Sequence, residues 1–178
     1  MSRSIPQTVT PLKKALGEPY LQLQLTQQIP AVLPMEYAQE ALVVGADTLT
    51  PIPNMSACVL GLLNRRSRVF WVVDLSQVLG LPAHTTNVQF YNIVLAKVGK
   101  RSLGLVVPEV RGVERFSSAA VRSPIGAVPP AMVPFLRGCI CLPAQKDILL
   151  VLDPESIING AIYPSSLGNI SLSQMNPF

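Results

Sequence analysis

Two stretches of the chain follow the same order of features. Residues 61–80 (GLLNRRSRVFWVVDLSQVLG) and 138–160 (GCICLPAQKDILLVLDPESIING) each run from a glycine through an apolar segment, a polar turn and a second apolar segment to an aspartate and a short helical segment. Short apolar runs bounded by turn residues are typical of buried β-strands. The repeated order therefore predicts a mainly β protein made of two similar β subdomains, each closed by a short helix.

An aspartate stands before each predicted helix. Asp74 opens a capping box, which predicts a helix over 75–79. Asp153 precedes a proline, which the first turn of a helix tolerates, and this second helix is predicted to end at Gly160. Because capping accounts for both carboxylates, we do not interpret them as a catalytic or metal-binding pair.

Alternation and turn residues predict the remaining strands. Residues 20–25 alternate between apolar and glutamine side chains, which predicts a strand with its leucines inward and its glutamines in water. The run 69–73 does not alternate, so both of its faces are predicted to be covered. Further strands are expected at 30–44, 92–98, 103–107 and 112–116.

The chain is predicted to form one structured unit between two loose ends. Residues 1–17 are expected to be a flexible N-terminal segment, and 161–178 an uncharged C-terminal tail. The unit between them, 18–160, holds both β subdomains, with their boundary near 81–90, where a polar connector interrupts the apolar pattern. A Pro-rich loop is expected at 117–134.

Positive charge is gathered at the bend of the first repeat. Residues 64–68 (NRRSR) carry three of the fourteen Lys and Arg residues of the chain. Only 13% of all residues are charged, against about 25% in a typical soluble domain. Part of the apolar surface is therefore predicted to bind a partner, although a neutral surface of Ser, Thr, Asn and Gln would give the same composition.

The sequence lacks the residue patterns of catalysis and of metal binding. It contains one histidine and no nucleophile elbow, phosphate-binding loop or dinucleotide fingerprint. Cys58, Cys139 and Cys141 are predicted to be buried free thiols, as expected in a reducing cytoplasm. We therefore expect no enzyme activity, no cofactor and no metal.

No segment of the sequence predicts membrane insertion. Pro, Gly or a charge interrupts each apolar run before the ~18 residues of a membrane span. The N-terminus lacks the apolar core of a signal peptide. These features predict a cytoplasmic protein.

The run VLGLLNRRSRVFWVVDLSQVLGL (59–81) resembles the signature hairpin of CheW-like domains, in which G-x-x-N-x-R-G precedes an apolar strand, Asp-Leu and a short helix. GLVVPEV (104–110), FLRG (135–138) and ILLVLD (148–153) resemble further motifs of that family in the same order. The resemblance implies two five-stranded, SH3-like β-barrels that share a core. It also implies a non-catalytic adaptor between the signalling tip of a chemoreceptor and the CheW-like domain of a CheA-type histidine kinase. The apolar strand and neutral tail are similar to those of adaptors from phototaxis and twitching motility, in which the partner would be a photoreceptor.

The resemblance assigns roles to individual residues. The family's hairpin glycine, asparagine and arginine correspond to Gly61, Asn64 and Arg66. Glu40 resembles the glutamate that can face this arginine, and Ala38 falls on the strand that contacts the kinase. Ser67 replaces the glycine that usually follows the arginine, so either the turn type differs or this motif position is relaxed.

The roles of the three arginines remain open in the sequence. Arg66 is either a partner contact or an ion-pair partner of Glu40, and the two roles are compatible. Arg65 and Arg68 are predicted to be solvated charges at the rim of the surface. The alternative function is a nucleic-acid-binding β-barrel that uses the basic bend 64–68. With only 6% aromatic residues and no exposed aromatic strand beside the bend, we predict no nucleic-acid partner.

Overall fold

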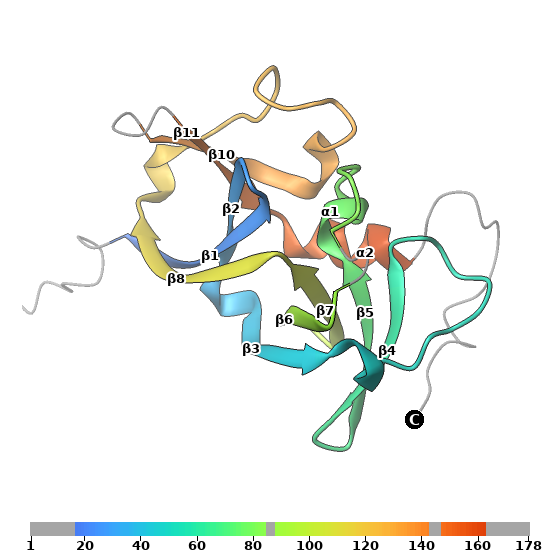
Figure 1. The fold of residues 1–178 in the computed structure, drawn as a ribbon. Coiled ribbons are helices and arrows are strands. Elements are labelled where there is room, and N and C mark those ends of the chain that lie inside the picture. Colours follow the sequence, from blue (N-terminus) through green and yellow to red (C-terminus); the bar gives the residue numbers. More distant parts are fainter. Residues whose placement is uncertain (1–16, 85–87, 143–146, 163–178) are drawn as a thin grey trace, which may run out of the picture.

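The chain folds into two curled β-sheets (Figure 1), and the computed structural model describes residues 17–84, 88–142 and 147–162. In spatial order, the six-stranded sheet contains β8 (Glu109–Phe116), β1 (Glu18–Thr26), β2 (Ile29–Pro34), β11 (Asp147–Leu152), β10 (Leu136–Leu142) and β9 (Val121–Arg122). The five-stranded sheet contains β3 (Ala38–Gly45), β6 (Phe90–Val98), β7 (Arg101–Val107), β5 (Arg68–Asp74) and β4 (Val59–Arg65). The prediction of two β subdomains is confirmed. One sheet has a sixth strand because the short β9, within the predicted Pro-rich loop, pairs with β10.

The repeated order in the sequence corresponds to two hairpin–helix units. The β4–β5 hairpin leads into α1 (Leu75–Val78), and the β10–β11 hairpin leads into α2 (Pro154–Ile162). In each unit the second strand of the hairpin also pairs in parallel with a strand from outside the unit, β5 with β7 and β11 with β2. The similarity of the two subdomains therefore extends from their sequence to their topology.

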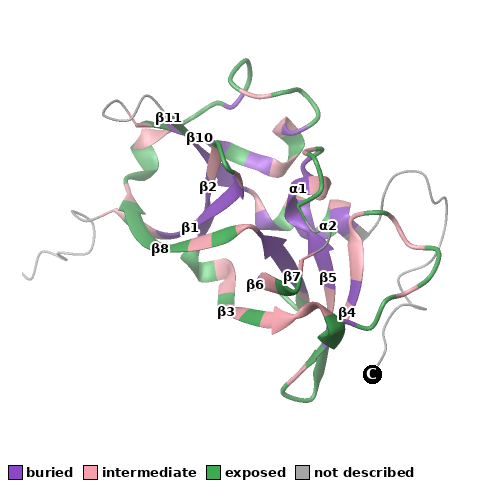
Figure 2. Cartoon of the chain, viewed as in Figure 1, coloured by how far each residue is buried: buried purple, intermediate pink, exposed green. Residues whose placement is uncertain are grey.

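One cluster of buried side chains joins the two sheets. It includes Leu23 and Leu152 from the six-stranded sheet, Leu105 from the five-stranded sheet, and Leu75 and Ile157 from the two helices, and none of the five is exposed to solvent. Smaller clusters fill the inner face of each curled sheet. The expected shared core is thus present, and Figure 2 shows it as the buried parts of the strands and helices between the two sheets.

The predicted boundary near 81–90 is not where the chain changes sheet. The strands on either side of it, β5 and β6, belong to the same five-stranded sheet. The chain passes between the sheets after β2 and again after β7, so 38–107 form one sheet and the flanking segments form the other. The polar connector only returns the chain from α1 to its own sheet.

Burial along β1 and β5 differs from the alternation rule. The leucines of β1 point inward as predicted, but Gln24 is buried as well, at 5% exposure. The six-stranded sheet curls, so the second face of β1 lies inside that sheet rather than in water. Val69, at the start of β5, is 51% exposed, so the prediction that both faces are covered fails at the outer end of this strand.

The helix caps follow the sequence, whereas one helix end does not. Asp74 Oδ1 accepts hydrogen bonds from the backbone N–H groups of Ser76 (2.9 Å) and Gln77 (3.4 Å), which confirms it as the cap of α1. The second helix continues past Gly160 to Ile162. The glycine leaves room for the Phe135 ring, since a Cβ at position 160 would lie 2.6 Å from that ring.

The cysteines are less uniformly buried than predicted. Cys139 is buried, Cys58 is half-buried and Cys141 is exposed, and all three are free. Cys141 stands near the end of β10, beyond the part of the sheet that the core covers. The predictions for the N-terminal segment and the C-terminal tail fall almost wholly on 1–16 and 163–178, which lie outside the described residues.

Candidate protein-binding site

The tip of the β4–β5 hairpin projects from the five-stranded sheet (Figures 1 and 2). Arg65 and Arg68 form the last pair of the antiparallel ladder, which leaves Arg66 and Ser67 as a two-residue turn. Both turn residues have positive φ, 50° and 62°, as a type I′ turn requires. Ser67 therefore adopts the left-handed conformation that glycine, the usual residue at this motif position, takes without strain. The turn holds the arginines at the tip of the hairpin.

Gly61 shapes the base of the hairpin and does not contact solvent. It is buried, its φ is 146°, and a Cβ at this position would lie 2.4 Å from the carbonyl oxygen of Thr50. The next residue, Leu62, exchanges two backbone hydrogen bonds with Thr50, of 2.8 and 2.9 Å. The motif glycine thus permits the close approach of a neighbouring segment. We interpret it as a residue that positions the hairpin.

An ion pair joins the two outer strands of the five-stranded sheet. Glu40 of β3 lies 2.6 Å from Arg65 Nη2 of β4, and 3.6 Å from Arg66 Nη2. The hydrogen bond from Arg65 lowers the pKa of Glu40 below its ordinary value. Desolvation opposes this shift, and the positive charges of Arg65 and Arg66 each add a smaller lowering effect. Because β3 and β4 are the edges of the curled sheet, the pair helps to close it.

Both neighbouring arginines pair with Glu40, and Arg66 was the predicted partner. Arg65, which was predicted to be a solvated rim charge, makes the closer contact with Glu40, and 41% of its side chain remains exposed. Arg66 makes the longer contact, and 76% of its side chain is exposed. It is therefore the more accessible of the two arginines at the tip. Arg68 is exposed, as predicted.

A pocket of about 410 Å³ lies beside the ion pair. It is lined by Gln39, Glu40, Arg65, Arg66, Arg68, Phe70 and Leu95. Within the described part of the chain, Nε of Arg65 is buried and has no hydrogen-bond partner. An unsatisfied buried donor costs free energy, so this nitrogen offsets part of the stability that the Glu40 contact provides.

The other predicted site residues lie around this pocket. Asn64 is exposed on β4, next to Arg65, and Ala38 is half-buried at the start of β3, where it packs against the main core. Neither residue lines the pocket. The structure therefore groups Glu40 with the three arginines and places Asn64 and Ala38 at the margins.

Sequence reasoning missed a cluster around Arg137. Its guanidinium donates a hydrogen bond to the Tyr37 hydroxyl (2.9 Å), lies 4.9 Å from the centre of that ring, and is 3.6 Å from Asp153. Partial burial disfavours the charged form, but the bond to Tyr37 and the negative charge of Asp153 together raise the pKa of Arg137. Arg137 belongs to the FLRG motif, which was the available signal.

Sequence reasoning also missed Lys97 and Lys100, which lie near the β6–β7 turn. Together with Arg68 they line a further pocket.

Within 17–84, 88–142 and 147–162, we find no group of His, Cys, Asp and Glu side chains placed to hold a metal. Over the same residues, no helix is both long enough and apolar enough to span a bilayer.

The CheW-like domain family matches residues 19–161, which is most of the chain. The chain belongs to the CheW-like domain family. A relative, the chemotaxis protein CheW of Rhizobium meliloti (strain 1021), is 31% identical over 116 residues, which cover 65% of this chain and 70% of that protein. The crystal structure of the scaffolding protein TtCheW from Thermoanaerobacter tengcongensis superposes with a TM-score of 0.66 at 17% identity, covering 78% of this chain and 90% of that one.

Membership of this family confirms the resemblance and the expected pair of SH3-like β subdomains. The CheW family, whose domain makes up most of this chain, is a family of non-catalytic scaffolding adaptors, which confirms the expectation that this chain is not an enzyme. The phototaxis or twitching-motility subtype stays a prediction. Neither similarity favours the nucleic-acid alternative.

Proposed function

We propose that this chain couples the signalling tip of a chemoreceptor-type sensor to the CheW-like domain of a CheA-type histidine kinase. In this proposal it acts in the cytoplasm, where membrane-associated receptor arrays recruit it. Its role is that of a scaffold, which holds the two partners together and performs no reaction itself.

The hairpin tip is the observation that supports this proposal most directly. A type I′ turn holds Arg66 at the tip of the hairpin, with 76% of its side chain exposed. Arginine is enriched at the centres of protein interfaces because its planar guanidinium can donate two parallel hydrogen bonds to one carboxylate. The hairpin therefore offers an exposed arginine to a partner.

The proposal is tested by co-purification of the full chain with a CheA-type kinase and with a receptor signalling fragment from the same organism. We expect the wild type to retain both partners and Arg66→Glu to retain less of the kinase or of the receptor. Arg122→Glu, which makes the same charge change at an exposed position of β9 in the other sheet, is the matched control. Wild-type protein that retains neither partner would contradict the proposed function.

The fold of the variant must be checked in the same experiment. Because Arg65 provides the closer contact to Glu40, we expect Arg66→Glu to keep the circular dichroism spectrum of the wild type. An unfolded Arg66→Glu variant would instead assign Arg66 a structural role within the monomer.

A further inference from the structure

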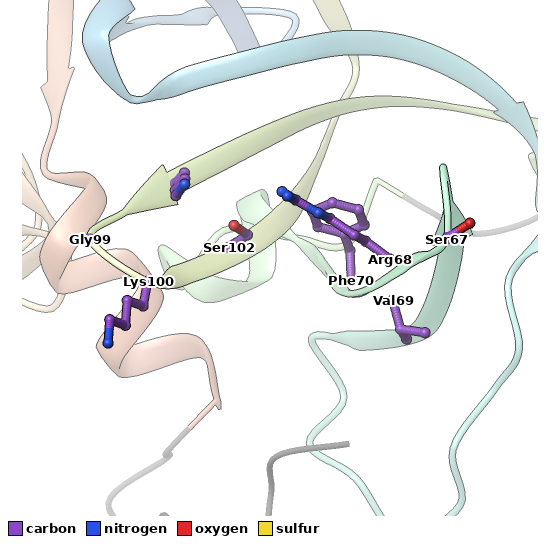
Figure 3. A pocket seen from close by; sticks show the side chains of 8 residues that line it. Ser67, Arg68, Val69, Phe70, Gly99, Lys100 and Ser102 are labelled. Carbon is purple, nitrogen blue, oxygen red and sulfur yellow. The ribbon is translucent and has the colours of Figure 1, made fainter. Parts of the chain in front are cut away.

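A second pocket lies beside the hairpin tip, between it and the β6–β7 hairpin (Figure 3). Its volume is about 540 Å³. We name it the basic cleft, after the side chains that line it: Ser67, Arg68, Phe70, Lys97, Lys100 and Ser102. In Figure 3 the Arg68 side chain extends from β5 toward the strand that carries Ser102, whereas Val69 points the other way.

The cations of the basic cleft have no internal counter-charge. Among the described residues, the ion pairs involve Arg65, Arg66, Arg111 and Arg137, and none involves Arg68, Lys97 or Lys100. All three cleft cations are exposed, and no acidic side chain lines the cleft. Their charge is therefore available to an external anion.

Positive charge is concentrated on the surface that holds the basic cleft and the neighbouring pocket beside Glu40. The basic cleft and the neighbouring Glu40 pocket share Arg68 and together hold five basic residues and one acidic residue. The chain has fourteen basic and ten acidic residues, so nine of each sign remain elsewhere. The excess of four positive charges on this surface equals the formal net charge of +4, and four of the other nine basic residues, at positions 3, 13, 14 and 146, lie outside the described residues.

The lining of the cleft favours carboxylates of a polypeptide over a nucleic acid. Single-stranded nucleic acids bind through basic groups interleaved with exposed aromatic rings. Phe70 is the one aromatic residue lining either of these two pockets, and it is 6% exposed. The cleft instead offers hydrogen-bond donors to the carboxylates of Asp and Glu: the Arg68 guanidinium, two lysine ammonium groups and two serine hydroxyls.

We propose that the basic cleft binds an acidic segment of a partner protein, with carboxylates seated between Arg68 and the lysines at positions 97 and 100. This inference deepens the proposed function, on which it rests for the identity of the partner. According to this inference, the partner supplies the acidic side chains of the interface. The cleft is then a second contact area of this chain, and Arg66 does not line it.

The test measures binding of fluorescein-labelled poly-L-glutamate, the acidic probe, to the full chain by fluorescence anisotropy. The salt concentration is kept at about 50 mM so that ions screen the charges only weakly. Lys97→Glu reverses one cleft charge. Arg122→Glu makes the same change in net charge on an exposed strand of the other sheet. We expect Lys97→Glu to weaken poly-glutamate binding about tenfold and Arg122→Glu to have less than about a twofold effect.

Three results would overturn the inference. Equal losses in both variants would mean that the probe senses only net charge. Displacement of poly-glutamate by a lower concentration of single-stranded DNA, with the same loss in Lys97→Glu, would assign the cleft to nucleic acid. Self-association that Lys97→Glu abolishes would assign it to a second copy of the chain. Retention of the kinase by the wild type tests the proposed function independently, so failure of one leaves the other standing.

Discussion

At the scale of single residues, the β4–β5 hairpin depends on contacts with residues outside it, which the hairpin sequence alone does not indicate. Gly61 is a motif residue because a neighbouring backbone occupies the space of its missing Cβ. Arg65 and Arg66 are adjacent in the sequence, yet Arg65 makes the closer contact with Glu40 of β3, whereas the side chain of Arg66 is the more exposed of the two. Each difference gives a prediction.

Gly61→Ala is expected to destabilise the protein by about 2 kcal/mol, because the new Cβ meets the Thr50 carbonyl and the backbone keeps a φ that alanine avoids. Urea unfolding followed by Trp71 fluorescence measures the loss. Gly99→Ala is the control, since Gly99 also has positive φ, at 59°, but open space around its Cβ position. It should cost about 1 kcal/mol for the backbone alone. Equal losses in the two variants would show that the Thr50 contact is unimportant.

The Glu40 ion pair is expected to make stability sensitive to acid. The pKa of the Glu40 carboxyl group is lowered in the folded state. The ion pair therefore contributes fully to the free energy of unfolding above pH 4.5, the ordinary pKa, and this contribution is lost as the pH falls through the lower pKa of the folded state. Arg65→Ala should therefore remove more of the difference in stability between about pH 7 and about pH 3 than Arg66→Ala does. Urea unfolding at both pH values measures this difference. A larger effect of Arg66→Ala would restore the role first predicted for it.

The Glu40 contact could be predicted from the sequence only as a pairing with one of the arginines. The hairpin motif placed the positive charge correctly, because a turn with fixed register is a local feature. The choice between Arg65 and Arg66 depends on how far the sheet curls to bring β3 beside β4. That curl arises from packing between distant segments, which no short motif reports.

At the scale of elements, the hairpin–helix unit is the part of the fold that the sequence expresses best. Strand, turn, strand, aspartate cap and helix follow one another within about twenty residues, and each boundary has its own local chemistry. The parallel pairings of β5 with β7 and of β11 with β2 join segments that are farther apart. No local sequence pattern marks these parallel pairings. For this reason the predicted boundary near 81–90 does not coincide with a change of sheet.

Asp74→Ala is expected to lower the free energy of unfolding by about 2 kcal/mol. Asp74 is fully buried, and its carboxylate accepts hydrogen bonds from the N–H groups of Ser76, Gln77 and His84, so alanine leaves the buried Ser76 N–H and two partly buried donors without this acceptor. Asp74→Asn keeps one acceptor oxygen and should lose less. Urea unfolding of both variants at neutral pH gives the comparison. If the two lost equal stability, the cap would act through its charge and not through its hydrogen bonds.

At the scale of the whole molecule, the two sheets share one core even though they are built from different parts of the chain. The five-stranded sheet is continuous in sequence, whereas the six-stranded sheet needs both flanking segments. The family resemblance implied a shared core, but it did not indicate that both helices would contribute to the same cluster as both sheets. For a scaffold, this arrangement keeps the hairpin and the basic cleft fixed relative to the rest of the protein.

The shared core leads us to expect that both sheets unfold in one transition. Trp71, the only tryptophan, reports on the five-stranded sheet, and labelling of the Cys139 thiol, in a variant with serine at the other two cysteines, reports on the six-stranded sheet. Cys139 is protected in the native state because it is buried, and burial raises the pKa of its thiol. Leu105→Ala removes a side chain of the five-stranded sheet from the common cluster, at a cost of roughly 3 kcal/mol. It should lower the urea midpoints of both probes equally, whereas a shift of the Trp71 midpoint alone would show that the sheets unfold independently.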